Sequence, residues 1–154
     1  MIIESPSFMH EGSIPLRYTC DGLNVSPPLI WRDIPAGTKS LAIIVDDPDA
    51  PDPASPKMTW VHWVLYNIPD TACGIKEGSV PEGAKTGVND SHHTGYDGPC
   101  PPLGRHRYFF KLYALNIVLP DLGHPTKTAL IKSMQGHVIG SAQLIGLYQH
   151  RGAL

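Results

Sequence analysis

Proline and glycine recur along this chain and leave little room for long helices. They account for 16 and 15 of the 154 residues, and both interrupt regular structure, proline by removing a backbone N–H and glycine by its conformational freedom. Charged residues make up only 17% of the chain, whereas the exposed faces of a helical bundle need more. The sequence therefore predicts a turn-rich, mainly β protein, and its length favours a single domain over residues 1–154.

Three apolar runs rich in β-branched and aromatic residues are predicted to be strands: Lys39–Asp46, Trp60–Ile68 and His106–Asn116. Alternation in the second run predicts that one face carries Trp60, His62, Val64, Tyr66 and Ile68. Alternation in the third predicts one face with His106, Tyr108, Phe110, Leu112 and Ala114.

A helix is predicted only near the C-terminal end. Thr126 can cap a helix over Lys127–Gln135, and Gly136 lies where such a helix would end. Leu144–Gln149 fits either a short strand or a second helical turn. Strands with one or two short peripheral helices predict an antiparallel β-sandwich or a partly open barrel.

Charge and hydropathy exclude several classes of partner. The net charge is −2 and no basic run exists, so neither nucleic acid nor a polybasic membrane contact is expected. The longest apolar stretches, Leu41–Val45 and Val61–Tyr66, are far shorter than the roughly 20 residues that span a bilayer. The first residues lack the pattern of a signal peptide, so a cytoplasmic location is expected.

The cysteines are predicted to be reduced thiols. Cys20, Cys73 and Cys100 are odd in number and show no CxxC spacing, which fits a reducing compartment better than a disulfide framework.

Four motifs combine polar side chains with rigid loops, the arrangement in which β scaffolds often hold a binding site. They are Asp46-Asp47-Pro48-Asp49-Ala50-Pro51, Trp60-Val61-His62-Trp63, Gly98-Pro99-Cys100-Pro101-Pro102 and Gly104-Arg105-His106-Arg107-Tyr108. Each also has a purely structural interpretation. Asp47 and Asp49 could form Asx-turns before proline, His62 could be a hydrogen-bonded core histidine, and Tyr108 could be a core residue whose hydroxyl reaches the surface.

Taken together and in this order, the motifs resemble the phosphatidylethanolamine-binding protein family, whose members are also called Raf-kinase-inhibitor-like proteins. The short Gly98–His106 link is similar to that of the bacterial and archaeal branch, and the resemblance runs from Ser7 to Tyr148. It implies an antiparallel β-sandwich and a non-catalytic protein that binds a phosphate-like anion or a phosphorylated head group. It also implies possible inhibition of a kinase or protease target, and a possible homodimer. No cofactor is implied. One departure from the family pattern is Asn89-Asp90-Ser91-His92-His93, where the resemblance implies an Asn-Asp-Phe/Trp-Gly run.

The resemblance places eight residues at the ligand pocket: Asp47, Asp49, His62, Cys100, Pro101, Pro102, His106 and Tyr108. A bare carboxylate repels a phosphate, so Asp47 is expected to accept a hydrogen bond from His62 or His106 and to favour the imidazolium. The anion would then meet histidine N–H groups, the Tyr108 hydroxyl and a backbone N–H of the proline-rich loop. Alternatively, Asp47 faces the ammonium of a zwitterionic head group.

Two enzymatic alternatives remain open at this stage. A metal- or histidine-dependent phosphoester hydrolase could draw its ligands from Asp47, His62, His92, His93 and His106. Cys100, with His106 nearby in sequence, could be a nucleophile, although a small packing residue is the simpler interpretation.

Overall fold

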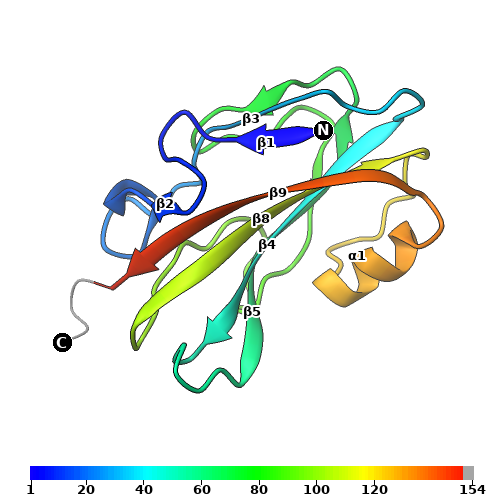
Figure 1. The fold of residues 1–154 in the computed structure, drawn as a ribbon. Helices are drawn as coiled ribbons and strands as arrows, with labels where there is room; N and C mark the ends of the chain where they lie inside the picture. The colour runs from blue at the N-terminus through cyan, green and yellow to red at the C-terminus, as the bar shows by residue number, and fades with distance from the viewer. Residues whose placement is uncertain (151–154) are drawn as a thin grey trace.

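Two β-sheets pack face to face in the computed structural model, which describes residues 1–150 (Figure 1). The smaller sheet has the order β1 (Ile2–Glu4), β3 (Leu29–Arg32), β6 (Gly74–Ile75). The larger has the order β2 (Gly12–Ser13), β9 (Val138–Gln149), β8 (Arg105–Leu115), β4 (Ser40–Ala50), β5 (Met58–Pro69), β7 (Lys85–Thr86). All neighbours are antiparallel except β2 and β9, which are parallel. The predicted mainly β sandwich is confirmed.

The three predicted strands are present as β4, β5 and β8, the central strands of the larger sheet. Strand β4 continues beyond the predicted end at Asp46 as far as Ala50. The segment Leu144–Gln149, which the sequence left open, belongs to β9 and pairs with β8. The predicted face of β8 is correct, since His106, Tyr108, Phe110, Leu112 and Ala114 are all buried.

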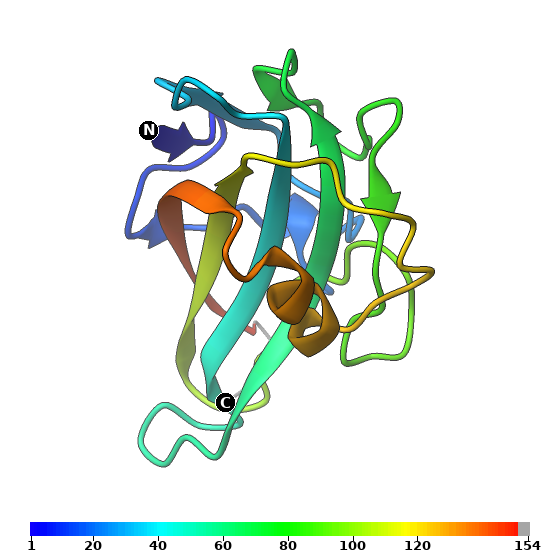
Figure 2. The same cartoon turned by 90° about the vertical axis from the view of Figure 1, so that its right-hand side faces the viewer.

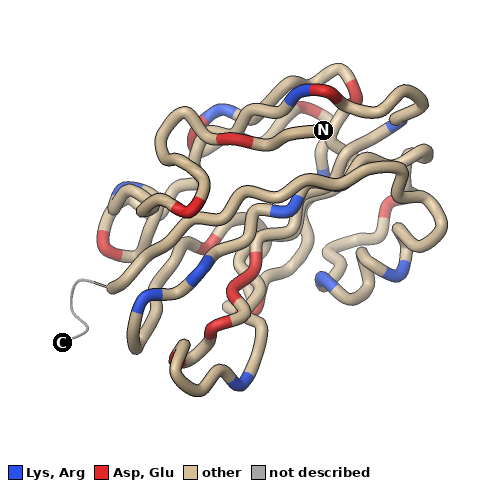
Figure 3. Tube along the Cα trace, in the orientation of Figure 1, with Lys and Arg blue, Asp and Glu red and all other residues tan. Residues whose placement is uncertain are grey.

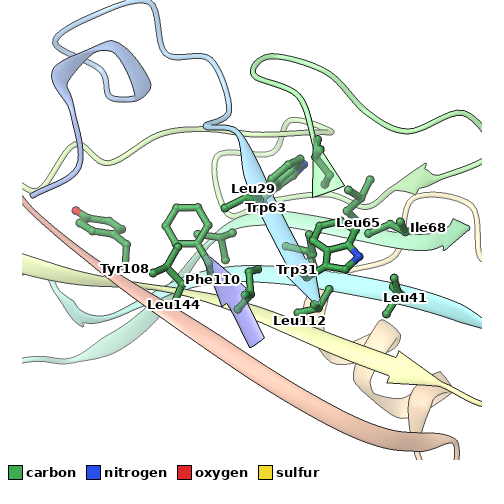
Figure 4. Close-up of a cluster of buried hydrophobic side chains, with 14 of the residues drawn as sticks. Leu29, Trp31, Leu41, Trp63, Leu65, Ile68, Tyr108, Phe110, Leu112 and Leu144 are labelled. Atoms are coloured by element: carbon green, nitrogen blue, oxygen red, sulfur yellow. The ribbon is translucent and has the colours of Figure 1, made fainter. Parts of the chain in front are cut away.

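The main core lies between the two sheets. Leu29 and Trp31 of β3 face Leu41 and Leu112 of the larger sheet (Figure 4). Full burial of side chains of this size contributes about 1.5–3 kcal/mol each. This layer holds the two sheets together.

Helix α1 (Lys127–Met134) covers the opposite face of the larger sheet (Figure 2). Leu130 and Met134 pack there against Ile44 and Val64 in a second buried cluster. The predicted cap is confirmed, because Thr126 Oγ1 accepts a hydrogen bond from the Ala129 backbone N–H. A further short turn of 3-10 helix, η1, covers Leu16–Tyr18. No helix within residues 1–150 is long and apolar enough to cross a bilayer.

The predicted alternation along Trp60–Ile68 is wrong, because β5 contains two irregularities. Val64 and Tyr66 pack on the helix side of the sheet, whereas Ile68 lies in the core between the sheets. The register with β4 slips by one residue near Asn67, whose φ is 53°. A second slip makes His62 the extra residue on β5, since Val61 and Trp63 pair with consecutive residues of β4. Such bulges bend a strand and re-aim a side chain.

Candidate functional site

The four sequence motifs meet around one cavity of about 340 Å³ at the end of the larger sheet. This volume falls in the range of small-molecule sites. Strands β4, β5 and β8 supply one part of the wall, and the loops before β5 and β8 supply the rest. The lining residues are Asp47, Ala50, Pro51, Met58, Trp60, His62, Ser91, Asp97, Gly98, Cys100, Pro101, Pro102, His106 and Tyr108.

Acidic residues gather where β4 approaches the cavity (Figure 3). Successive side chains of a strand point to opposite faces, so Asp46 and Asp47 have different roles. Asp46 lies on the helix side and accepts hydrogen bonds from Lys111 Nζ at 3.0 Å and Lys127 Nζ at 2.6 Å. Asp47 lines the cavity. The motif therefore brings one carboxylate to the site and uses the other to anchor α1.

Asp47 and His106 form a buried pair. His106 Nδ1 lies 2.5 Å from Asp47 Oδ2, and the histidine is fully buried. The other ring nitrogen, Nε2, lies 2.7 Å from the carbonyl oxygen of Leu103 and 3.1 Å from that of Pro51. Carbonyl oxygens only accept, so Nε2 carries a proton, and a second proton lies between Nδ1 and the carboxylate. The pair neutralises the charge that Asp47 would otherwise present to an anion.

This geometry corrects the expected role of His106. An N–H group of His106 was expected to meet the anion, but both ring nitrogens are bonded to protein acceptors. Asp47 does accept from a histidine, as expected. Its second oxygen, Oδ1, accepts from the Asp49 backbone N–H at 2.7 Å. The Asx-turn expected of Asp47 is therefore present, and the same residue also lines the cavity.

His62, unlike His106, has only one ring nitrogen bonded to the protein, and it also lines the cavity. Its Nδ1–H donates to the Asp97 carbonyl oxygen at 2.7 Å, and the Asp97 backbone N–H donates to the His62 carbonyl oxygen at 3.0 Å. Within residues 1–150, Nε2 has no protein partner. Burial lowers the pKa of His62, and the hydrogen bond to Asp97 and the nearby Asp47 carboxylate oppose this shift only in part. At neutral pH the empty-cavity form is a neutral imidazole with a lone pair on Nε2.

Tyr108 provides the second available polar atom. Its ring meets that of His62 edge-on, with centroids 5.2 Å apart, and stacks on His106 at 6.3 Å. Burial, followed by the Asp47 charge, raises the pKa of Tyr108 far above its ordinary value. The hydroxyl is therefore a neutral donor, and it has no hydrogen-bond partner among residues 1–150.

Several wall residues were not singled out by the sequence, and Asp97 is the most important of them. Its carbonyl fixes His62, while its carboxylate accepts from Asn24 Nδ2 at 3.1 Å and from Ser91 Oγ at 2.5 Å. Trp60 and Ser91 also line the cavity; both lie within quoted stretches of sequence, but nothing in their spacing identified them.

Gly98 permits the close approach of this wall to η1. An added Cβ would collide with the Tyr18 carbonyl oxygen and with Asn24 Oδ1. The Gly98 N–H donates to that same Asn24 oxygen at 2.7 Å. Because Pro99, Pro101 and Pro102 have no N–H, Cys100 is the residue among positions 99–102 that can offer a backbone N–H to a ligand.

The predicted reduced state of two cysteines is wrong. Cys20 and Cys100 form a disulfide across 80 residues of sequence, whereas Cys73 is free and exposed. The bond ties the loop of the cavity wall to the segment after η1. In this form Cys100 has no thiolate, so it is not the nucleophile considered above. Cys100, Pro101 and Pro102 do line the cavity.

Asp49 was expected at the pocket, but its side chain bonds outside the cavity wall. Its carboxylate pairs with Arg107 at 2.9 Å and also accepts from the Arg107 backbone N–H. These Arg107 hydrogen bonds hold the pKa of Asp49 below its usual range. Asp49 therefore fastens the end of β4 to β8.

The histidines considered for a metal-dependent hydrolase are not assembled as a ligand set. Both nitrogens of His106 are committed, and His92 and His93 are exposed beside the cavity residue Ser91. In residues 1–150, the grouping of metal-ligand side chains is elsewhere, at Cys20, Cys100 and His150.

Comparisons with known proteins agree with this architecture. The family model for phosphatidylethanolamine-binding proteins matches residues 4–149. The chain is 49% identical to the UPF0098 protein of Methanothermobacter thermautotrophicus, over 97% of this chain and 99% of that protein. A similar protein from Chlamydia pneumoniae is 42% identical over 97% of this chain and 99% of its own.

Two crystal structures have the same fold. A phosphatidylethanolamine-binding protein homologue from Chlamydia trachomatis superposes with a TM-score of 0.90 at 40% identity, covering 96% of both chains. Escherichia coli YbcL, described as a member of the mammalian family, gives 0.86 at 30% identity, covering 97% of this chain and 98% of its own. Motifs, sandwich and cavity all lead to one assignment: the chain belongs to the phosphatidylethanolamine-binding protein family.

Proposed function

We propose that the cavity binds a phosphate-like anion, either inorganic phosphate or the phosphate monoester of a head group, without catalysing a reaction on it. The proposal rests on two polar atoms, His62 Nε2 and the Tyr108 hydroxyl. Both belong to residues of the cavity wall, their rings are in contact, and neither atom has a protein partner among residues 1–150. Buried polar groups are normally hydrogen-bonded, so a ligand with oxygen atoms completes this pair.

The electrostatics of the cavity wall support binding of the phosphate group as a monoanion, with one proton retained. His106 neutralises Asp47, and the Asp97 carboxylate already accepts from Asn24 and Ser91. The Tyr108 hydroxyl donates to one phosphate oxygen. A proton is shared between His62 Nε2 and a second phosphate oxygen. The ligand therefore meets donors while both carboxylates are engaged elsewhere.

The cavity has room for more than the phosphate group. Met58, Trp60, Pro101 and Pro102 add apolar surface to the wall. A monoester with a small organic substituent fits this combination better than the bare ion. The same group occurs on a free head group and on a phosphorylated side chain of a kinase or protease target. The relative affinities for phosphoethanolamine and for a phosphopeptide distinguish these two sources, and competition between them shows whether both use this cavity.

Replacement of Tyr108 by phenylalanine tests the proposal. A hydrogen bond to a charged group contributes about 1.5–3 kcal/mol, so Tyr108→Phe is expected to weaken phosphoethanolamine binding by about 10- to 150-fold in calorimetry. Tyr113→Phe is the matched control, because Tyr113 lies on the same strand but outside the cavity wall, and it should bind normally. Equal binding by both variants would refute the assigned role of the hydroxyl.

The absence of catalysis is tested separately. The protein is incubated with phosphoethanolamine, and released phosphate is measured against a His62→Ala variant. No release above the protein-free background is expected. Release that depends on His62 would replace the binding proposal with the hydrolase alternative.

A further inference from the structure

The side chain of Asn24 fastens the segment after η1 to the part of the cavity wall that carries Asp97 and Gly98. Asn24 Oδ1 accepts a hydrogen bond from the Gly98 backbone N–H at 2.7 Å, and Asn24 Nδ2 donates to Asp97 Oδ1 at 3.1 Å. These partners lie 73 and 74 residues further along the chain. Asn24 is not one of the residues that line the cavity, so any effect on a ligand passes through the wall.

The Gly98 N–H and the Asp97 carbonyl belong to one peptide group. A trans peptide is planar, and its N–H and C=O bonds point in opposite directions. On one side the N–H donates to Asn24 Oδ1. On the other side the carbonyl oxygen accepts from His62 Nδ1–H at 2.7 Å. Asn24, this peptide group and the imidazole therefore form a continuous chain of hydrogen bonds that ends at His62 Nε2.

This chain decides where the proton of a neutral His62 lies. The tautomer of a histidine is set by the hydrogen bond that one ring nitrogen makes. A carbonyl oxygen only accepts, so Nδ1 carries the proton and Nε2 carries the lone pair. Hydrogen bonds in a chain polarise one another, so the bond from Gly98 to Asn24 makes the Asp97 carbonyl a stronger acceptor. A stronger acceptor at Nδ1–H in turn makes Nε2 more basic.

The backbone at Asn24 is shaped for this contact. Its φ is 57°, in the left-handed region that asparagine tolerates better than most residues, and its N–H donates to the Arg17 carbonyl oxygen at 3.0 Å. Asn67 on β5 has the same design, with a φ of 53° and a side chain that bonds both the N–H and the carbonyl of Leu119. Of these two asparagines, Asn24 is the one bonded to the cavity wall, since neither Asn67 nor Leu119 lines the cavity.

We propose that Asn24 is a positioning residue of the cavity, which fixes the Asp97–Gly98 peptide group and thereby keeps the His62 proton on Nδ1 and the lone pair on Nε2. Its consequence for binding rests on the proposed function, in which Nε2 shares a proton with a phosphate oxygen. Without the amide of Asn24, the peptide group is held less firmly and both tautomers of His62 are populated. A less basic Nε2 shares the proton less favourably, so the affinity falls.

The first test is NMR of the ring nitrogens of His62 in the ligand-free protein, at about pH 8.5, where imidazoles are neutral. The unaltered protein should show a protonated Nδ1 and an unprotonated Nε2. Asn24→Gly retains access to positive φ but removes both side-chain hydrogen bonds, and the shifts of the two nitrogens should move toward each other. Asn67→Gly is the matched control, because it loses an equivalent contact away from the cavity, and it should leave these shifts unchanged. Asn24→Asp keeps an oxygen to accept from Gly98 and should keep the tautomer.

The second test is calorimetry with phosphoethanolamine. Asn24→Gly should weaken binding about 5- to 10-fold, the effect of about one neutral hydrogen bond, whereas Asn67→Gly should bind as the unaltered chain does. If the unaltered protein does not bind phosphoethanolamine, the proposed function fails, while the ring-nitrogen shifts still decide the role of Asn24.

Four results would overturn the inference about Asn24. They are unchanged ring shifts in Asn24→Gly, an equal change in Asn67→Gly, a loss of the tautomer in Asn24→Asp as complete as in Asn24→Gly, and a proton on Nε2 in the unaltered protein. The last result needs no variant, so the inference can be refuted even if Asn24→Gly does not fold.

Discussion

The protonation of His62 leads to a quantitative prediction for the binding of phosphoethanolamine. Burial lowers the pKa of this histidine, so the free protein carries a neutral imidazole near neutral pH. A phosphate monoester loses its second proton at about pH 6, so the free ligand is a dianion above that pH. The complex holds one proton between His62 Nε2 and a phosphate oxygen. Binding therefore takes up one proton from solution.

Uptake of one proton changes the affinity by a factor of ten for each pH unit. Between pH 6.5 and pH 8.5, the dissociation constant should rise about 100-fold, equivalent to about 2.7 kcal/mol. Binding is strong at the lower pH because the shared proton is readily supplied, and it weakens as the pH rises. Calorimetry at pH 8 in two buffers with different heats of ionisation measures the proton uptake directly, and its expected value is about one.

His62→Gln separates this mechanism from general electrostatic effects. Glutamine can still donate a hydrogen bond to the ligand but does not titrate. The variant should bind more weakly at pH 6.5, show no proton uptake at pH 8, and lose most of the dependence on pH. Zero uptake by the unaltered protein, or the same slope in the variant, would refute the shared-proton complex.

Three further predictions concern stability, each measured by denaturant unfolding. Replacing Cys20 and Cys100 by serine removes a link between residues 80 apart and should cost up to about 4.5 kcal/mol by loop entropy, whereas Cys73→Ser should have little effect. Asp46→Asn removes a buried carboxylate that accepts from two lysine ammonium groups and should cost about 2 kcal/mol. Gly98→Ala forces a Cβ against backbone oxygen and should cost about 1–3 kcal/mol; an unchanged midpoint in any of the three would contradict its assigned contact.

The fold was predictable from sequence where a local rule decides the outcome. The alternation of β8 holds without interruption, because its register with β4 does not slip, and all five residues predicted for one face are buried. The helix was predictable because its start depends on a nearby hydroxyl, Thr126. In both cases the interactions that decide the structure lie within a few residues or follow a fixed period.

The interrupted alternation of β5 depends on its neighbour instead. The residue at a bulge is set by the pairing with β4 and by what packs on each face, and Asn67 and His62 carry no local mark of an inserted position. The prediction that Cys20 and Cys100 are reduced was wrong for a related reason. Cysteines 80 residues apart pair only if the fold brings their Cβ atoms together, and counting cysteines gives no information about that approach.

The two site histidines show most clearly where the sequence information ends. His62 and His106 are the same residue type in motifs of the same resemblance, and both were expected to donate to the anion. The structure gives them different tasks through the acceptors that surround them. His106 meets a carboxylate and two carbonyl oxygens, so both nitrogens are committed to the protein. His62 meets a single carbonyl oxygen, so its other nitrogen has no partner among residues 1–150. These oxygens come from Asp47, Pro51, Asp97 and Leu103, which lie in loops and strands distant in sequence. A motif can therefore identify the histidines that line such a cavity, but the oxygen atoms that close around each ring decide which histidine keeps a nitrogen without a protein partner.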